Sequence, residues 1–203
     1  MVWYKLGLLL VGFVFAGILP YSVRKVLKQI DLDLTKQTLS FISNKSLFGK
    51  KYKKNYTRLM FASAILLYAF FWLLTKCYDL GENERFLRYI DYSFAFLALL
   101  AFVPHNMNKY SLKSLGPSLQ RFAHNVLGLV VFLSIPILVI TFQIAIINDL
   151  VILGIAGLAI IGSTVLLTAY SIFRTGLNGI SELIFINGVS IWILFVTVYT
   201  VLF

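Results

Sequence analysis

The side chains best able to carry chemistry in this sequence are two histidines, a glutamate and three asparagines that border long apolar segments. They are His105, Asn106, His124, Asn125, Glu182 and Asn187. A histidine beside a carboxylate can relay protons, the same groups can bind a divalent metal, and two histidines at one depth can ligate haem. His124 and Glu182 could equally be paired polar contacts that lock helices together, or part of a site for a lipid or solute. The residue types alone leave these alternatives open.

The spacing of these residues favours no particular enzyme. The chain has no His-Glu-x-x-His, no Gly-x-Ser-x-Gly and no glycine-rich phosphate loop, the patterns that make metal, nucleophile and nucleotide sites recognisable. Cys77 is the one cysteine, which excludes an intrachain disulfide. We therefore predict no catalytic residue, no bound metal and no cofactor, and keep haem or metal binding by His105 and His124 as a remote alternative.

The elements that must position these side chains are transmembrane helices. Hydrophobic residues make up 60% of the 203 and charged residues 13%, whereas soluble domains have about 45–50% and about 25%. A helix needs about 20 apolar residues to cross the hydrocarbon core. Six segments approach this length: 2–19, 59–75, 86–103, 122–145, 150–170 and 183–203. The sequence predicts a single all-α domain, a polytopic bundle of six transmembrane helices.

The basic residues predict the orientation of this bundle. Fourteen of the 18 Lys and Arg residues fall in or beside the first, third and fifth loops, and four fall on the opposite side. Because Lys and Arg near spans are retained in the cytoplasm, both termini are expected outside it. We expect a multi-pass protein of the bacterial cytoplasmic membrane.

The first loop, 20–58, is long, basic and amphipathic. Within 23–34 the apolar residues recur at helical spacing, which predicts a helix that lies along the inner leaflet. Its expected headgroup contacts are Arg24, Lys25, Lys28, Lys50, Lys51, Lys53 and Lys54. The alternative is that these charges only set topology.

Anionic membrane lipids are therefore the expected partner. A second copy of the chain or another membrane protein is an open alternative. Nucleic acid is not expected, because the net charge of +10 is concentrated beside spans and no nucleic-acid fold signature accompanies it. Seven aromatic residues near span ends are expected to anchor the bundle in the headgroup layer. They are Trp3, Tyr4, Trp72, Tyr89, Tyr92, Trp192 and Tyr199.

Residues 101–196 carry a resemblance to a known group of proteins. Its parts are Phe102-Val103-Pro104-His105, the His124 that opens a span containing Pro136, Gly176-Leu177 before Glu182, and Trp192. This pattern resembles an uncharacterised bacterial six-span family, a domain of unknown function that is loosely similar to the DRAM/Frag-type six-span proteins. The first loop here is longer and more basic than in that family, and its arginine beside the glutamate is absent. The resemblance implies a fold and a polar pair, and no activity.

Two classes of function follow from these observations. The favoured class is a non-enzymatic protein that binds a lipid or amphiphile or serves as a partner subunit. The alternative is a small proton-coupled transporter that uses His124 and Glu182. A transporter usually has polar residues at the bilayer midplane, whereas the centres of these spans are almost wholly apolar.

Overall fold

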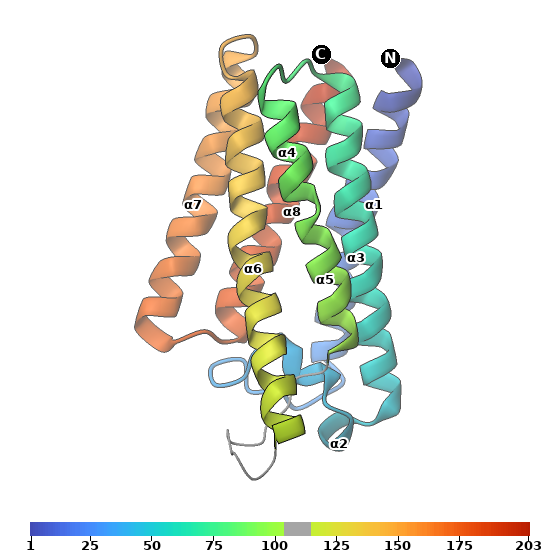
Figure 1. The fold of residues 1–203 in the computed structure, drawn as a ribbon, viewed down its shortest axis with the longest axis vertical. Coiled ribbons are helices and arrows are strands. Elements are labelled where there is room, and N and C mark those ends of the chain that lie inside the picture. Colours follow the sequence, from blue (N-terminus) through green and yellow to red (C-terminus); the bar gives the residue numbers. More distant parts are fainter. Residues whose placement is uncertain (104–114) are drawn as a thin grey trace.

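The computed structural model describes residues 1–103 and 115–203, and every regular element in these two ranges is a helix. Figure 1 shows the long helices running side by side along the longest axis, with both ends of the chain at one end of the bundle. The elements are α1 (Val2–Leu27), the 3-10 helix η1 (Leu39–Ser43), α2 (Lys45–Phe48), α3 (Lys50–Cys77), α4 (Asn83–Asp91), α5 (Ser93–Phe102), α6 (Leu115–Ile146), α7 (Val151–Thr175) and α8 (Gly179–Leu202).

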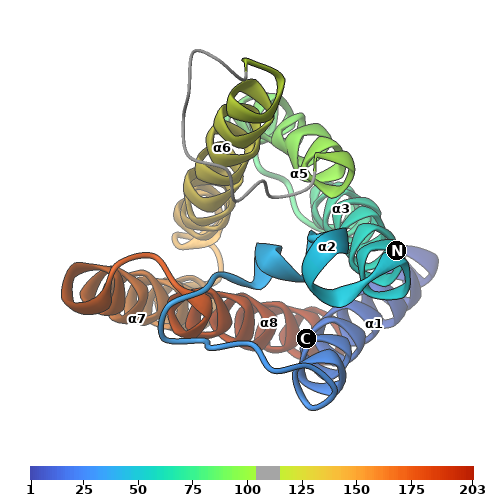
Figure 2. The same ribbon diagram turned by 90° about the horizontal axis from the view of Figure 1, so that it is seen from below.

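The helices form a closed ring. Going round it, α1 packs on α3, α3 on α5, α5 on α6, α6 on α7, α7 on α8, and α8 again on α1. The view along the bundle in Figure 2 shows this ring and places the blue segment between α1 and α2 across its middle. This arrangement gives the bundle an interior that is lined by residues from nearly every helix.

Five helices in the described ranges are long and apolar enough to cross a membrane: α1, α3, α6, α7 and α8. Each overlaps one of the expected spans and extends past at least one of its predicted edges. For example, α1 runs on to Leu27, and α3 begins at Lys50. The extra turns are rich in Lys and Arg, whose long side chains reach water while the backbone stays helical. The protein is therefore an all-helical chain with the character of a multi-pass membrane protein.

The segment expected as the third span is divided between α4 and α5. Ala95 N–H donates to Tyr92 O at 3.0 Å, a three-residue turn where the two helices meet. α4 is polar, with Glu84 in its first turn paired to Arg88 in its last turn at 2.7 Å, and α5 is almost wholly apolar. Figure 1 shows α4 and α5 following one another along the length of the bundle.

The predicted surface helix over 23–34 is wrong. α1 continues through Leu27, and residues 28–38 lie outside any helix. The apolar side chains that suggested a surface helix instead face the bundle, where Val23 is 6% exposed and Leu34 packs against the core. Asp33 accepts hydrogen bonds from Thr35 N and Thr35 Oγ1 at 3.0 and 2.6 Å, which favours a turn over a helix. The same hydrogen bonds hold the pKa of Asp33 below its ordinary value.

The half of the bundle nearer the termini is filled by aromatic rings around Trp192. Phe71 stacks on the indole at 5.8 Å, and Phe70 and Phe142 meet it edge-on at 5.9 and 6.1 Å. Trp192 is fully buried, so its predicted role as a headgroup anchor is wrong. The indole needs a hydrogen-bond acceptor when it is buried.

Gln143 supplies that acceptor. With its amide oxygen turned to the indole, Gln143 accepts from Trp192 Nε1 at 2.7 Å and donates to Leu153 O at 3.0 Å. α7 comes close here because Gly157 faces the amide, and a Cβ at Gly157 would lie 2.2 Å from the Gln143 amide. This half of the interior is therefore closely packed, and the open space lies in the other half.

Candidate functional site

A cavity of about 920 Å³ occupies the half of the bundle away from the termini. It is bounded by α1, α3, α5, α6, α8 and the segment that holds η1. Its walls are mostly apolar, with Phe15, Leu67, Leu97, Ile135 and Val189 contributing from five different helices. Binding sites for small organic ligands have volumes of about 300–1,000 Å³ and similar apolar walls.

The floor of this cavity is residues 34–42, which cross from the end of α1 toward α2. Leu39 and Ile42 line the cavity and are 5% and 4% exposed. Thr38 and Ser40 also line it and share a hydrogen bond of 2.7 Å between their hydroxyls. The floor is a structured part of the cavity wall.

The first turn of α8 anchors this floor. The N–H of Gly179 donates to Gln37 O at 2.8 Å, and Ile180 N–H donates to Leu34 O at 3.3 Å. The Nδ2 of Asn178 donates to Thr35 O at 3.2 Å. The first N–H groups of a helix have no acceptor within the helix itself, so α8 uses the loop carbonyls to satisfy them. Asn178 also caps α8 through hydrogen bonds from Ile180 N and Ser181 N.

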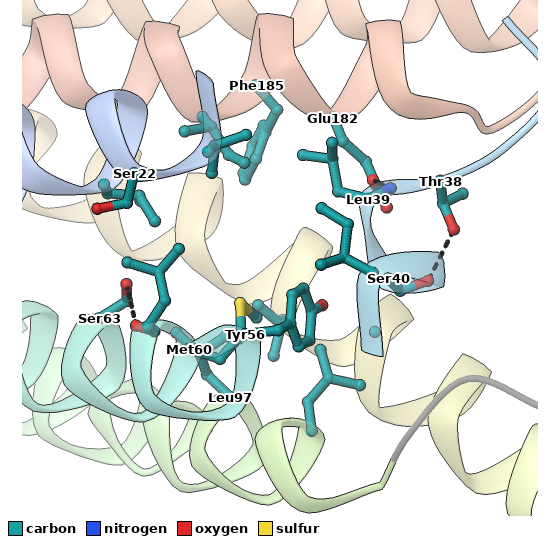
Figure 3. A pocket seen from close by; sticks show the side chains of 18 of the residues that line it. Ser22, Thr38, Leu39, Ser40, Tyr56, Met60, Ser63, Leu97, Glu182 and Phe185 are labelled. Carbon is teal, nitrogen blue, oxygen red and sulfur yellow. Dashed lines mark hydrogen bonds between the residues drawn. The ribbon is translucent and has the colours of Figure 1, made fainter. Parts of the chain in front are cut away.

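Glu182 contributes one more bond to the floor. Its Oε2 accepts a hydrogen bond from Leu39 N–H at 2.5 Å. Figure 3 shows Glu182 reaching from α8 toward Leu39, while Tyr56 enters the cavity from α3. Both side chains line the cavity. No hydrogen bond to the Tyr56 hydroxyl is formed by any residue in the described ranges, so this hydroxyl can serve a molecule inside the cavity.

His124 lines the cavity from α6 and is 5% exposed. Its Nδ1 lies 2.7 Å from Val103 O, at the end of α5, so this ring links the two helices. Asn125 lines the cavity beside it and is exposed. Leu129, one turn further along α6, is 61% exposed and also lines the cavity, so the cavity reaches the surface of the bundle at an apolar place.

The cavity therefore collects three of the six predicted polar residues, His124, Asn125 and Glu182. The hydrogen bonds described for His124 and Glu182 go to two different backbone groups. Asn187 donates to Leu183 O at 2.7 Å and accepts from Arg24 at 3.5 Å. The other two, His105 and Asn106, lie outside the described residues.

The basic residues expected at lipid headgroups gather at the cavity end of the bundle. Lys50, Lys51, Lys53 and Lys54 occupy the first two turns of α3. Lys25 lines the cavity, and Arg58, which is not among the predicted contacts, lines it from α3.

Sequence reasoning also missed Tyr56. Tyr52, Tyr56, Met60 and Ser63 recur every three or four residues, which places them on one face of a helix. Tyr52 and Tyr56 lie within the basic stretch 50–58. The predicted span begins only at residue 59, so Tyr56 was not placed on a membrane helix.

A metal centre has little support in the described ranges, where no three His, Cys, Asp or Glu side chains are grouped closely enough to hold an ion. Searches against protein-family models, curated proteins and solved structures gave no match. The cavity and its polar residues therefore carry the functional argument.

Proposed function

We propose that this chain is a membrane protein with six crossings that binds an amphiphile in its interior. α4 and α5 together supply the sixth crossing, with the Tyr92 turn inside the membrane. An even number of crossings is supported by the position of both chain ends at one end of the bundle (Figure 1). The basic turns of α1 and α3 lie at the other end, which the positive-inside rule places in the cytoplasm.

The observation that carries the proposed function is the apolar cavity. Its volume of about 920 Å³ lies within the range of about 300–1,000 Å³ that is typical of sites for small organic ligands. Water finds few hydrogen-bond partners on walls made of Leu, Ile, Val and Phe. A molecule with a long apolar part is the occupant that suits these walls.

A proton-coupled carrier is the second candidate, because His124 and Glu182 both line the cavity. A carrier needs a path to the other side of the membrane. The rings around Trp192 fill that half of the bundle, and Gln143 is fully buried among them. A binding protein is favoured because it needs access from one side alone.

The experiment that tests amphiphile binding fills the cavity from within. Gly128 lines the cavity, and a Cβ built on it would meet nothing within 4 Å. Gly128→Leu should therefore fold and reduce the amount of lipid or dodecanol bound to the purified protein by about tenfold. Bound molecules would be counted by native mass spectrometry after release from a neutral detergent.

Gly162→Leu is the matched control. Gly162 is also a helical glycine with no atom within 4 Å of an added Cβ, and it lies on α7, outside the cavity. It should bind as much as the unchanged protein. Equal binding by all three proteins, or none by any, would contradict the proposed function.

A further inference from the structure

Two cationic side chains line the cavity from neighbouring helices. Lys25 comes from α1 and Arg58 from α3, two helices that pack against each other. Both side chains line the cavity and are also exposed, so they stand where the cavity meets its surroundings. Gln29 and Asn55 are also exposed and line the cavity with amide groups.

No carboxylate neutralises these two cations within the described ranges. The ion pairs there are Lys36 with Asp33 and Arg88 with Glu84. Glu182 is the one carboxylate that lines the cavity, and it is engaged with Leu39 N–H. The edge of the cavity at Lys25 and Arg58 therefore carries positive charge beside apolar walls, where Coulomb attraction is stronger than in water.

We infer that the cavity selects an anionic amphiphile, with its headgroup between Lys25 and Arg58 and its apolar chain inside. This inference rests on the proposed function and adds the charge and the direction of the ligand. The headgroup chemistry is a phosphate or a carboxylate, which Arg and Lys bind through charge-assisted hydrogen bonds.

The positions of the two cations set this orientation. Glu182, on the α8 wall, offers no positive charge and already accepts from Leu39 N–H, so a negative headgroup is favoured at Lys25 and Arg58 instead. Beyond Arg58, Ser63 turns its hydroxyl back to Leu59 O at 2.8 Å, which leaves an apolar surface. The chain then meets Leu67 and Phe15, which are each 2% exposed. The Tyr56 hydroxyl is available on the way as a donor to the ester or acid oxygen of the ligand.

The test compares ligands with one chain length and different headgroups. Dodecyl phosphate, dodecanoate, dodecanol and dodecyltrimethylammonium would be titrated against the full chain in a neutral detergent, with bound ligand counted by native mass spectrometry. The two anions should bind about 30-fold more tightly than dodecanol, because two cations contribute about 1 kcal/mol each. Dodecyltrimethylammonium should bind most weakly. The two anionic arms separate a phosphate lipid from a fatty acid.

The variants locate the headgroup. Lys25→Gln with Arg58→Gln should remove the preference for anions and leave dodecanol binding unchanged. Lys25→Arg with Arg58→Lys keeps both charges and should retain the preference, which guards against a failure to fold. The matched control is Lys76→Gln with Arg85→Gln, which removes one exposed lysine and one exposed arginine that do not line the cavity.

The outcomes separate the two proposals. If dodecanol and the anions bind equally to the unchanged protein, or if both Gln pairs reduce anion binding equally, the headgroup site is wrong while amphiphile binding stands. If none of the four ligands binds, the proposed function fails with it. Inorganic phosphate should compete with dodecyl phosphate but not with dodecanol. If inorganic phosphate binds as tightly as dodecyl phosphate, the alkyl chain contributes nothing and the inferred binding mode is wrong.

Discussion

At the scale of single residues, His124 and Glu182 act as two separate attachments. The Nδ1 of His124 hydrogen-bonds with Val103 O, directly after the last residue of α5. Glu182 accepts a hydrogen bond from Leu39 N–H in the cavity floor. Both side chains line one cavity, but each stabilises a different segment of its wall. A shared function of His124 and Glu182 would therefore depend on a ligand in the cavity that contacts both side chains. The contribution of each backbone hydrogen bond to stability can be measured separately.

The first prediction is that the effects of His124→Ala and Glu182→Gln on stability add. Each substitution should lower the free energy of unfolding by about 1–2 kcal/mol, because each weakens a partly buried hydrogen bond to the backbone. The double variant should lie within about 0.5 kcal/mol of the sum, because these hydrogen bonds go to two different backbone groups. Chemical unfolding in detergent measures all three values, with Glu82→Gln, at an exposed position, as the control. Strong coupling would instead show a direct clasp between the two side chains.

Residue types were enough to select these two positions, because ionisable groups near hydrocarbon are costly and rarely incidental. The same reasoning could not find the floor. Leu39, Ser40 and Ile42 belong to the site because of hydrogen bonds from a helix 143 residues away in sequence. Nothing in the local pattern of 34–42 carries that information.

At the scale of elements, glycines set how closely the helices approach. A Cβ at Gly12 of α1 would lie 2.1 Å from Thr197 Oγ1 on α8, and one at Gly188 of α8 would lie 2.2 Å from Thr164 Oγ1 on α7. Small residues allow this contact, which in lipid replaces the hydrophobic driving force between helices. α8 therefore packs closely against α1 on one side and against α7 on the other.

The second prediction concerns this packing. Gly12→Ala should lower the melting temperature in detergent, because the new methyl group overlaps Thr197 and overpacking costs about 1–3 kcal/mol. Gly162→Ala on α7 is the control, since its Cβ would meet nothing within 4 Å. It should be neutral or stabilising by up to about 1 kcal/mol, because Ala is the better helix former. Equal effects of the two substitutions would mean that α1 and α8 do not pack as described.

The length of the apolar runs predicted the long helices but not how the shorter elements are arranged. Five expected spans correspond to long helices because runs of about 20 apolar residues have few alternatives in a bilayer. The turn at Tyr92 and the end of α1 at Leu27 were missed. An apolar face has the same spacing whether it packs in a bundle or lies on a membrane, so the residues of 23–34 could not distinguish the two.

At the scale of the whole molecule, the sidedness of the bundle is a prediction that the arrangement makes testable. If α4 and α5 cross the membrane together, the loop before them and the start of α6 lie on opposite sides. Asp79 lies in the loop between α3 and α4, and Gly116 lies in the first turn of α6. The positive-inside rule places Gly116 in the cytoplasm.

The third prediction follows. In a Cys77→Ser background, Asp79→Cys and Asp149→Cys should react with a membrane-impermeant maleimide from outside intact cells. Gly116→Cys and Lys51→Cys should react after the cells are opened. Labelling of Asp79→Cys and Gly116→Cys from the same side would reduce the number of crossings to five, and reversed accessibility at all four positions would invert the bundle.

The attachment of the cavity floor to α8 also sets the order in which the protein can be completed during synthesis. Leu39 emerges from the ribosome 143 residues before Glu182, which at about 5–20 residues per second is a delay of roughly 7–30 s. Throughout that interval the carbonyls of Leu34 and Gln37 lack the N–H groups of Ile180 and Gly179. The floor can form these hydrogen bonds only after α8 has been synthesised. A nascent chain that stops before α8 would therefore leave residues 34–42 unanchored and accessible to the quality-control machinery of the cell.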